Sequence, residues 1–202
     1  MSTLKNYESR LLTTAAIYSL LSSSFTSDPK TIQKSVNSLR EIFDKLGMTE
    51  ESNLADNVIN IIKSDENASA EYVRLFEMGA APPCETAYTC AENMEHRTYE
   101  LADIAGFYRA FNVKQSTGTP DHIKAELEFM ALIMVKELLA HENSNTEAAE
   151  ICRDARRKFY REHLSRWVGE WVKKVRENAR KPLYIILTEL VSRIVSKHEL
   201  VT

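Results

Sequence analysis

Residues 119–142 read TPDHIKAELEFMALIMVKELLAHE, and this stretch decides the fold class. Its large apolar side chains recur at steps of 4, 3, 4 and 4 residues: Ile123, Leu127, Met130, Met134 and Leu138. That spacing keeps them on one face of an α-helix. Thr119 and Pro120 have the residue types of an N-cap and a first helical position. The pattern predicts a long helix, beginning at Pro120, in the centre of a hydrophobic core.

The composition of the whole chain extends this prediction to an all-α protein. The 202 residues include only 5 Gly and 5 Pro, and the apolar runs carry Ala, Leu, Met, Glu and Lys instead of spaced β-branched residues. A hydrophobic content of 44% beside 27% charge is enough for a sizeable core and excludes general disorder. We therefore expect a single globular domain of roughly eight to ten helices and no sheet.

The polar residues 112–119, which include Gly118, interrupt the helical pattern. This stretch is the predicted hinge between an N-terminal half, residues 1–111, and a C-terminal half, residues 120–202, of one helical domain. Exchange of the C-terminal half between two chains through this hinge would give a domain-swapped dimer. The sequence leaves monomer and domain-swapped dimer open.

Membrane and secreted proteins are poor matches to this sequence. The longest uninterrupted apolar run, residues 129–135, is far below the about 18–20 residues that cross a bilayer, and residues 1–5 lack the profile of a signal peptide. The three cysteines form neither a CxxC motif nor an even disulfide framework: Cys84, Cys90 and Cys152. We expect a cytoplasmic protein without stable membrane insertion.

Charge is unevenly distributed along the chain. The formal net charge is −3, yet residues 41–150 hold 8 Lys and Arg against 21 Asp and Glu. A field of that sign attracts cationic ligands and repels nucleic acid. We therefore expect no nucleic-acid partner and favour a positively charged ligand.

Motifs of metal and nucleotide chemistry are missing from the sequence. None of the five histidines has a Glu three residues before it, as a carboxylate-bridged di-iron bundle would require, and no GxxxxGK[ST] loop occurs. The sequence predicts no metal site and no cofactor. One alternative stays open, a helical hydrolase or lyase that uses Asp121, His122 and Glu126, and another is a scaffold that binds only folded proteins. Asp121 and His122 are expected in an exposed first helical turn.

An apolar stripe before a double proline points instead to a binding surface. Tyr72, Leu75 and Phe76 follow an i, i+3, i+4 spacing, Pro82 and Pro83 form a stiff loop, and Tyr88 comes just after it. Such a stripe is also typical of an ordinary core helix. Because Glu85 and other carboxylates are interleaved with it, the stripe would suit a groove for a short, partly apolar, positively charged peptide.

Five short motifs resemble a known family. They are EYVRLF at 71–76, PPCETAY at 82–88, LADIAGFY at 101–108, PDHI at 120–123 with ELEFM at 126–130, and FYREHL at 159–164 with Trp167. In this order and spacing they resemble the TorD/DmsD/NarJ family, cytoplasmic chaperones that mature molybdenum oxidoreductases of the dimethyl sulfoxide reductase type. The resemblance covers roughly residues 70–170.

The resemblance implies an all-helical chaperone without a catalytic site. Its partner would be the twin-arginine signal peptide or N-terminal tail of the catalytic subunit of a molybdopterin oxidoreductase, held until the cofactor is inserted. The carboxylates would bind the two arginines, and a groove beside them would take the apolar stretch. Ten residues are the expected peptide-binding set: Tyr72, Leu75, Phe76, Pro82, Pro83, Glu85, Tyr88, Asp121, His122 and Glu126.

Overall fold

The computed structural model describes residues 2–64, 68–90, 94–114 and 118–197, with side chains from residue 5 onward. These residues form ten α-helices and two π-helical turns: α1 (Ser2–Ser24), α2 (Pro29–Leu46), α3 (Thr49–Ser64), α4 (Ala68–Tyr72), η1 (Val73–Glu77), α5 (Thr86–Thr89), α6 (Met94–Ala110), α7 (Ile123–Glu142), α8 (Thr146–Phe159), η2 (Tyr160–Leu164), α9 (Ser165–Asn178) and α10 (Pro182–Ser196). Apart from one isolated bridge between Cys84 and His122, the described residues contain no β-structure. The all-α prediction of eight to ten helices is confirmed. No described helix is long and apolar enough to cross a membrane.

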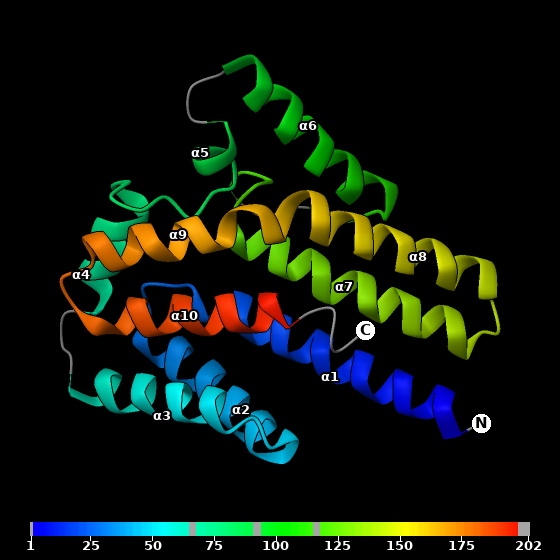
Figure 1. Ribbon diagram of the computed structural model, residues 1–202, viewed down its shortest axis with the longest axis horizontal. Coiled ribbons are helices and arrows are strands. Elements are labelled where there is room, and N and C mark those ends of the chain that lie inside the picture. The colour runs from blue at the N-terminus through cyan, green and yellow to red at the C-terminus, as the bar shows by residue number, and fades with distance from the viewer. Residues whose placement is uncertain (1, 65–67, 91–93, 115–117, 198–202) are drawn as a thin grey trace.

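Helix α7 occupies the centre of the molecule, as its periodicity predicted. Ile123, Leu127, Met130 and Met134 are fully buried. Helix α1 packs along one side of α7 and α8 along another (Figure 1). This helix therefore supports both the N-terminal and the C-terminal part of the chain.

The predicted start of α7 at Pro120 is wrong. The helix begins at Ile123, and His122 is its N-cap: the Nδ1 atom of His122 accepts the backbone N–H of Lys124 at 3.1 Å. The preceding backbone is drawn into an extended pairing, because Glu85 N–H donates to Asp121 C=O at 2.9 Å and Ile123 N–H donates to Pro83 C=O at 2.8 Å. The double-proline loop and the start of α7 therefore hold each other in place.

Helices from before and after the expected hinge share one core. Besides the pairing of α1 with α7, the last helix, α10, packs against α3 and α9, and Figure 1 shows α10 between them. A single cluster of buried apolar side chains runs through all of these helices. Of the hinge prediction, residues 115–117 lie outside the described residues, while Asn112 and Gly118 beside them have positive φ angles of 53° and 79°.

Two π-helical turns change which side chains face inward. η2 joins α8 to α9 in one continuous run, and η1 continues α4. A π turn inserts an extra residue into the helical ladder and is frequent at functional sites. η2 places both His163 and Leu164 in the interior, and η1 does the same for Leu75 and Phe76.

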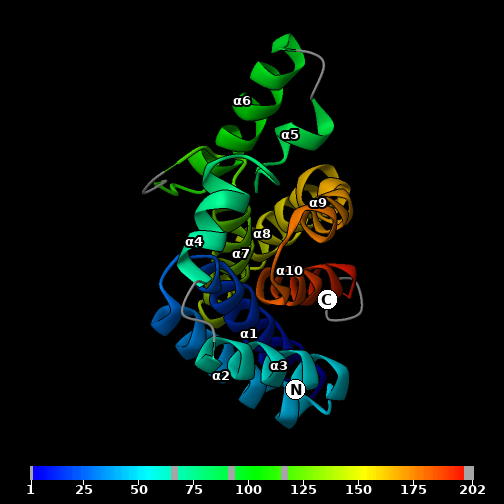
Figure 2. The ribbon, with the colours of Figure 1, turned by 90° about the vertical axis from the view of Figure 1, so that its left-hand side faces the viewer.

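Helix α6 projects away from the rest of the bundle (Figure 2). Only Ile104 and Tyr108 of its side chains are buried. The Phe107 ring meets the rings of Phe159 and His163 edge-on, at centroid distances of 5.3 and 5.6 Å. The attachment of α6 to the rest of the protein therefore depends on a few contacts near the C-terminal end of this helix and on the polar groups beside His163.

A buried ion-pair network joins α1, α7 and α8. Glu137 is fully buried; its carboxylate accepts from Arg153 Nε at 3.1 Å and from Arg156 Nε at 3.2 Å. The hydroxyl of Tyr7 donates to the same carboxylate. Arg156 is also fully buried. Both arginines lie on α8, so one carboxylate of α7 holds the neighbouring helix through two charged groups.

Candidate functional site: a buried acidic cluster and an open groove

Leu75 and Phe76 belong to the core and not to a surface groove. Leu75 has no exposed area and Phe76 is 7% exposed. The Phe76 ring lies 5.3 Å from the Tyr184 ring and 6.0 Å from that of Trp171, measured between centroids. Truncating Phe76 would therefore remove core packing, typically worth about 3–5 kcal/mol, before it changed any ligand contact. The interpretation of this stripe as an ordinary core helix fits its position.

The proline loop and Tyr88 form a support for the helices around them. The Tyr88 hydroxyl donates to the carbonyl of Pro82 at 2.9 Å, and its ring stacks on Trp167 at 5.7 Å between centroids. Pro83 is buried and accepts the first N–H of α7. These residues set the position of the α7 start relative to α9.

The three carboxylates of the predicted set are buried together: Glu85, Asp121 and Glu126 each have no exposed area. Asp121 accepts the backbone N–H of Thr86 at 3.2 Å and its hydroxyl at 2.6 Å. Glu126 accepts from Trp167 Nε1 at 3.0 Å. The expectation of an exposed Asp121 is wrong, because its carboxylate holds the first turn of α5 against the α7 start.

His163 supplies the positive charge that this acidic cluster needs. Its Nδ1 atom lies 3.2 Å from Glu85 Oε2, and its Nε2 atom lies 3.2 Å from Asp103 Oδ2. Burial alone would lower the pKa of His163, but the hydrogen bond and charge of Glu85 raise it. Burial raises the pKa of Glu85. Burial and repulsion by the Glu85 carboxylate together raise the pKa of Glu126 well above its ordinary range. The cluster therefore favours a neutral Glu126 beside a Glu85–His163 ion pair.

Among the described residues, Glu85, Glu100 and His163 could offer ligands to a metal ion, since one ligand atom from each lies within 4.8 Å of the others. Arg166 already occupies the acidic side of this group. Its Nη1 atom is 2.7 Å from Glu100 Oε1 and 3.9 Å from Glu85 Oε1. Arg166 supplies the positive charge that a metal cation would bring. The ion pairs of this group therefore connect α6, the α5 start and η2.

The hydrolase alternative requires Asp121, His122 and Glu126 to converge on one cavity. Asp121 is bonded to Thr86 and Glu126 to Trp167, both in the interior. The Nδ1 atom of His122 already accepts the backbone N–H that caps α7, and burial lowers the pKa of His122 to about 4. The three groups face different partners, so they form no acid–base pair around a substrate.

Glu126→Gln is expected to change how stability depends on pH. In the folded protein the raised pKa of Glu126 favours the protonated acid, whereas the unfolded chain releases this proton above its ordinary pKa. Stability is then lost as pH rises from that ordinary value towards the folded one, by up to about 1.4 kcal/mol per pH unit. Gln keeps an oxygen for Trp167 and does not titrate. In thermal unfolding from pH 5 to 9, the variant should be more stable than wild type, and the difference in stability should grow with pH.

Glu142→Gln is the matched control because it changes the same group on an exposed part of the same helix. If the stability of wild type and of Glu126→Gln changed with pH in parallel, the prediction would be contradicted.

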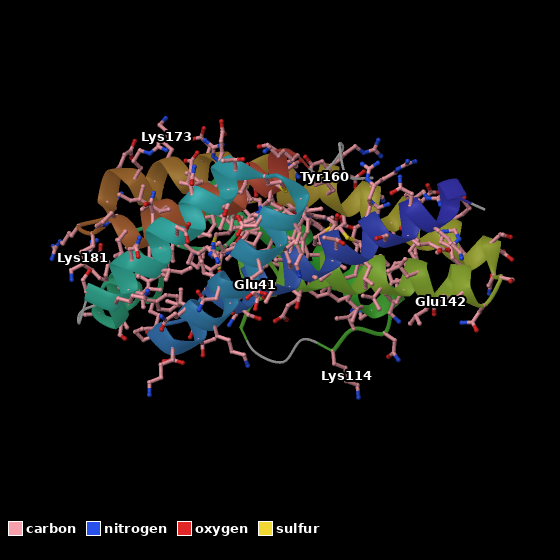
Figure 3. All side chains as sticks on the ribbon, turned by 90° about the horizontal axis from the view of Figure 1, so that it is seen from below. Glu41, Lys114, Glu142, Tyr160, Lys173 and Lys181 are labelled. Atoms are coloured by element: carbon pink, nitrogen blue, oxygen red, sulfur yellow. The ribbon has the colours of Figure 1, made fainter. Side chains whose placement is uncertain are left out.

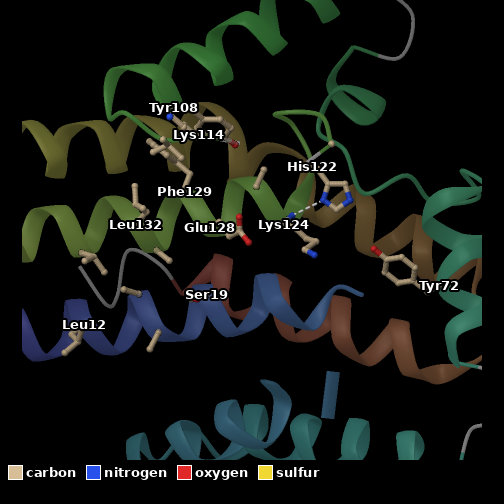
Figure 4. A pocket seen from close by; sticks show the side chains of 17 residues that line it. Leu12, Ser19, Tyr72, Tyr108, Lys114, His122, Lys124, Glu128, Phe129 and Leu132 are labelled. Carbon is tan, nitrogen blue, oxygen red and sulfur yellow. Dashed lines mark hydrogen bonds between the residues drawn. The ribbon is translucent and has the colours of Figure 1, made fainter. Parts of the chain in front are cut away.

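An open groove of about 840 Å³ lies next to this cluster, between α1, α7 and the segment that precedes α7 (Figure 4). Small residues keep it open: Ala15, Ala16 and Ser19 on α1, and Ala125 and Ala131 on α7. Larger apolar side chains form its walls. Of these, Leu12 is 57% exposed, Val135 is 40% exposed and Leu132 is 38% exposed. Exposed aliphatic side chains around a concave surface are typical of a binding site.

Of the ten predicted residues, only Tyr72 and His122 line the groove. Residue types and spacing missed its other walls, on α1 and on the outer face of α7. The sequence did contain one signal of the α7 wall. Leu132, Val135 and Leu139 lie off the stripe from Ile123 to Leu138, so α7 is apolar around most of its circumference, and such a helix needs cover on every side.

Comparison with known proteins places the chain in a family. The model of the family described as nitrate reductase delta subunit matches residues 63–173 and so spans all five motifs. A chlorate reductase assembly chaperone protein from Ideonella dechloratans is 29% identical over 66% of this chain and 69% of its own length. A selenate reductase assembly chaperone protein from Thauera selenatis is 31% identical over 54% of this chain and 58% of its own length. No solved structure gives a significant match. Because the matched region covers more than half of its residues, the chain belongs to the nitrate reductase delta subunit family.

Proposed function

We propose that the protein is a cytoplasmic assembly chaperone, and not a catalyst, for a molybdenum reductase of the dimethyl sulfoxide reductase type. Its ligand is the N-terminal segment of the reductase's catalytic subunit, either a twin-arginine signal peptide or a tail. The apolar stretch of that segment binds in the groove between α1 and α7. The names of the two relatives support the chaperone role, since both are called assembly chaperones of reductases.

The observation that carries the binding proposal is the exposure of Leu12, Leu132 and Val135 around one concavity. The groove follows α7 from His122 to Val135, which at 1.5 Å per residue is about 20 Å. That length matches an apolar helix of about 13 residues. A helix laid in an apolar groove is a recurring mode of peptide recognition.

Calorimetric titration of the full chain tests this function directly. The probe is a synthetic peptide that runs from the first residue to the end of the apolar stretch of a molybdopterin reductase subunit encoded beside this gene. We expect one peptide per chain and a Kd of about 10 μM or tighter. A scrambled peptide of the same composition is the control. Equal binding of both peptides, or binding of neither to folded protein, would overturn the proposal.

A further inference from the structure

The groove carries a charge opposite to the one that the sequence suggested. Its described lining contains two lysines, Lys114 and Lys124, and one carboxylate, Glu128. The carboxylates that were expected to bind an arginine pair, Glu85, Asp121 and Glu126, do not line it and are buried with partners of their own. Of the acidic residues in the middle of the chain, the described lining of the groove thus contains Glu128 alone.

The two lysines lie at different places along the groove. Lys124 follows the His122 cap at the start of α7, whereas Lys114 extends outward from the segment after α6, beside Tyr108 and Phe129 (Figures 3 and 4). Within the described parts of the chain, no carboxylate lies within ion-pair distance of either lysine. His122 is neutral near pH 7, so it does not alter the sign.

The one carboxylate in the lining already has a hydrogen-bond donor. Glu128 lies one helical turn after Lys124, and its Oε1 atom accepts from Ser22 Oγ at 3.2 Å, across the gap to α1 (Figure 4). Leu12, Leu132 and Val135 form the apolar wall farther along α7. The groove therefore has its lysines along the first half of α7, from Lys124 to the Lys114 that lies beside Phe129, and an apolar part beyond them.

We infer that the groove selects an apolar helical segment with an acidic side chain beside Lys114 or Lys124, and that it leaves a paired-arginine motif outside this part of the groove. The inference rests on the proposed function and specifies the ligand of the same site. In a twin-arginine signal peptide, the apolar stretch would occupy the groove and the arginines would lie beyond its apolar end or in solvent.

Three synthetic peptides test the inference. Each carries the same apolar helical stretch of about 13 residues, flanked at both ends by Glu-Glu, Gln-Gln or Arg-Arg, so that one pair lies at the lysine-lined part of the groove in either binding direction. We expect the Glu peptide to bind the full chain about tenfold more tightly than the Arg peptide at low salt, with the Gln peptide between them. The difference should disappear near 1 M salt, where the Debye length is about 3 Å. Because the chain has a net charge of −3, nonspecific attraction would give the reverse order.

The double variant Lys114→Gln with Lys124→Gln should bind all three peptides within about twofold of one another at low salt. Lys45→Gln with Lys63→Gln removes the same charge from exposed positions on α2 and α3 and should keep the tenfold preference. Equal affinities for wild type, or tighter binding of the Arg peptide, would overturn the inference while leaving groove binding in place. Failure of the Gln peptide to bind would count against the groove itself, and so against the proposed function.

Discussion

Replacing Glu137 by alanine is expected to lower the free energy of unfolding by about 3–5 kcal/mol. The carboxylate is fully buried between α7 and α8 and pairs with Arg153 and with the equally buried Arg156. Its loss removes the anion from two guanidinium groups, and one of them has no access to water. Tyr7 also loses the acceptor of its hydroxyl, so the contact with α1 weakens as well.

Urea denaturation followed by circular dichroism measures this loss. Glu150→Ala is the matched control: Glu150 also pairs with Arg153, but its side chain is 61% exposed. We expect this control to change stability by less than about 1 kcal/mol, as for exposed ion pairs generally. If the two variants were equally stable, the Glu137 network would have no special role in joining the three helices.

Leu132→Asp is expected to weaken binding of the reductase N-terminal peptide by at least about tenfold. Leu132 stands on the groove wall and is 38% exposed, so an apolar ligand would bury it and would desolvate an aspartate placed there. The fold should tolerate the change because the side chain already reaches solvent. The peptide titration described above measures the affinity, and thermal unfolding of the free protein reports its stability.

Leu139→Asp is the control for this prediction. Leu139 lies on the same helix and is 49% exposed, but it does not line the groove. The substitution makes the same chemical change and should leave the affinity within about twofold of wild type. Equal losses from the two variants would place the ligand along the outer face of α7 instead of in the groove.

The interior of α7 could be predicted from sequence because it depends on local periodicity. Ile123, Leu127, Met130 and Met134 are spaced for one helical face, and all are buried. The start of the helix could not be predicted in this way. Residue types favoured Pro120, but backbone pairing with residues 83–85 extends the chain through His122. A contact between segments more than thirty residues apart leaves no mark in local composition.

The burial of the acidic residues was missed for the same reason. Asp121, Glu85 and Glu126 find partners that lie 35, 78 and 41 residues away in sequence. From residue type alone, a carboxylate is expected in solvent. The groove was hidden because it results from small side chains on two helices, α1 and α7, that only the tertiary structure brings together. The resemblance covers roughly residues 70–170 and so contains the buried carboxylates, whereas the α1 wall of the groove lies outside it.

The position of α10 has a consequence for how the protein is made. Tyr184, near the start of this last helix, packs on Phe76 and donates a hydrogen bond to the carbonyl of Ala68 at 3.2 Å. A nascent chain lacks these contacts until residues beyond 182 have left the ribosome. Until then α3 and α9 expose the apolar faces that α10 will cover, and exposed surface of this kind makes incomplete chains prone to aggregation. We therefore expect the chain to be most vulnerable to aggregation in the interval before α10 has packed.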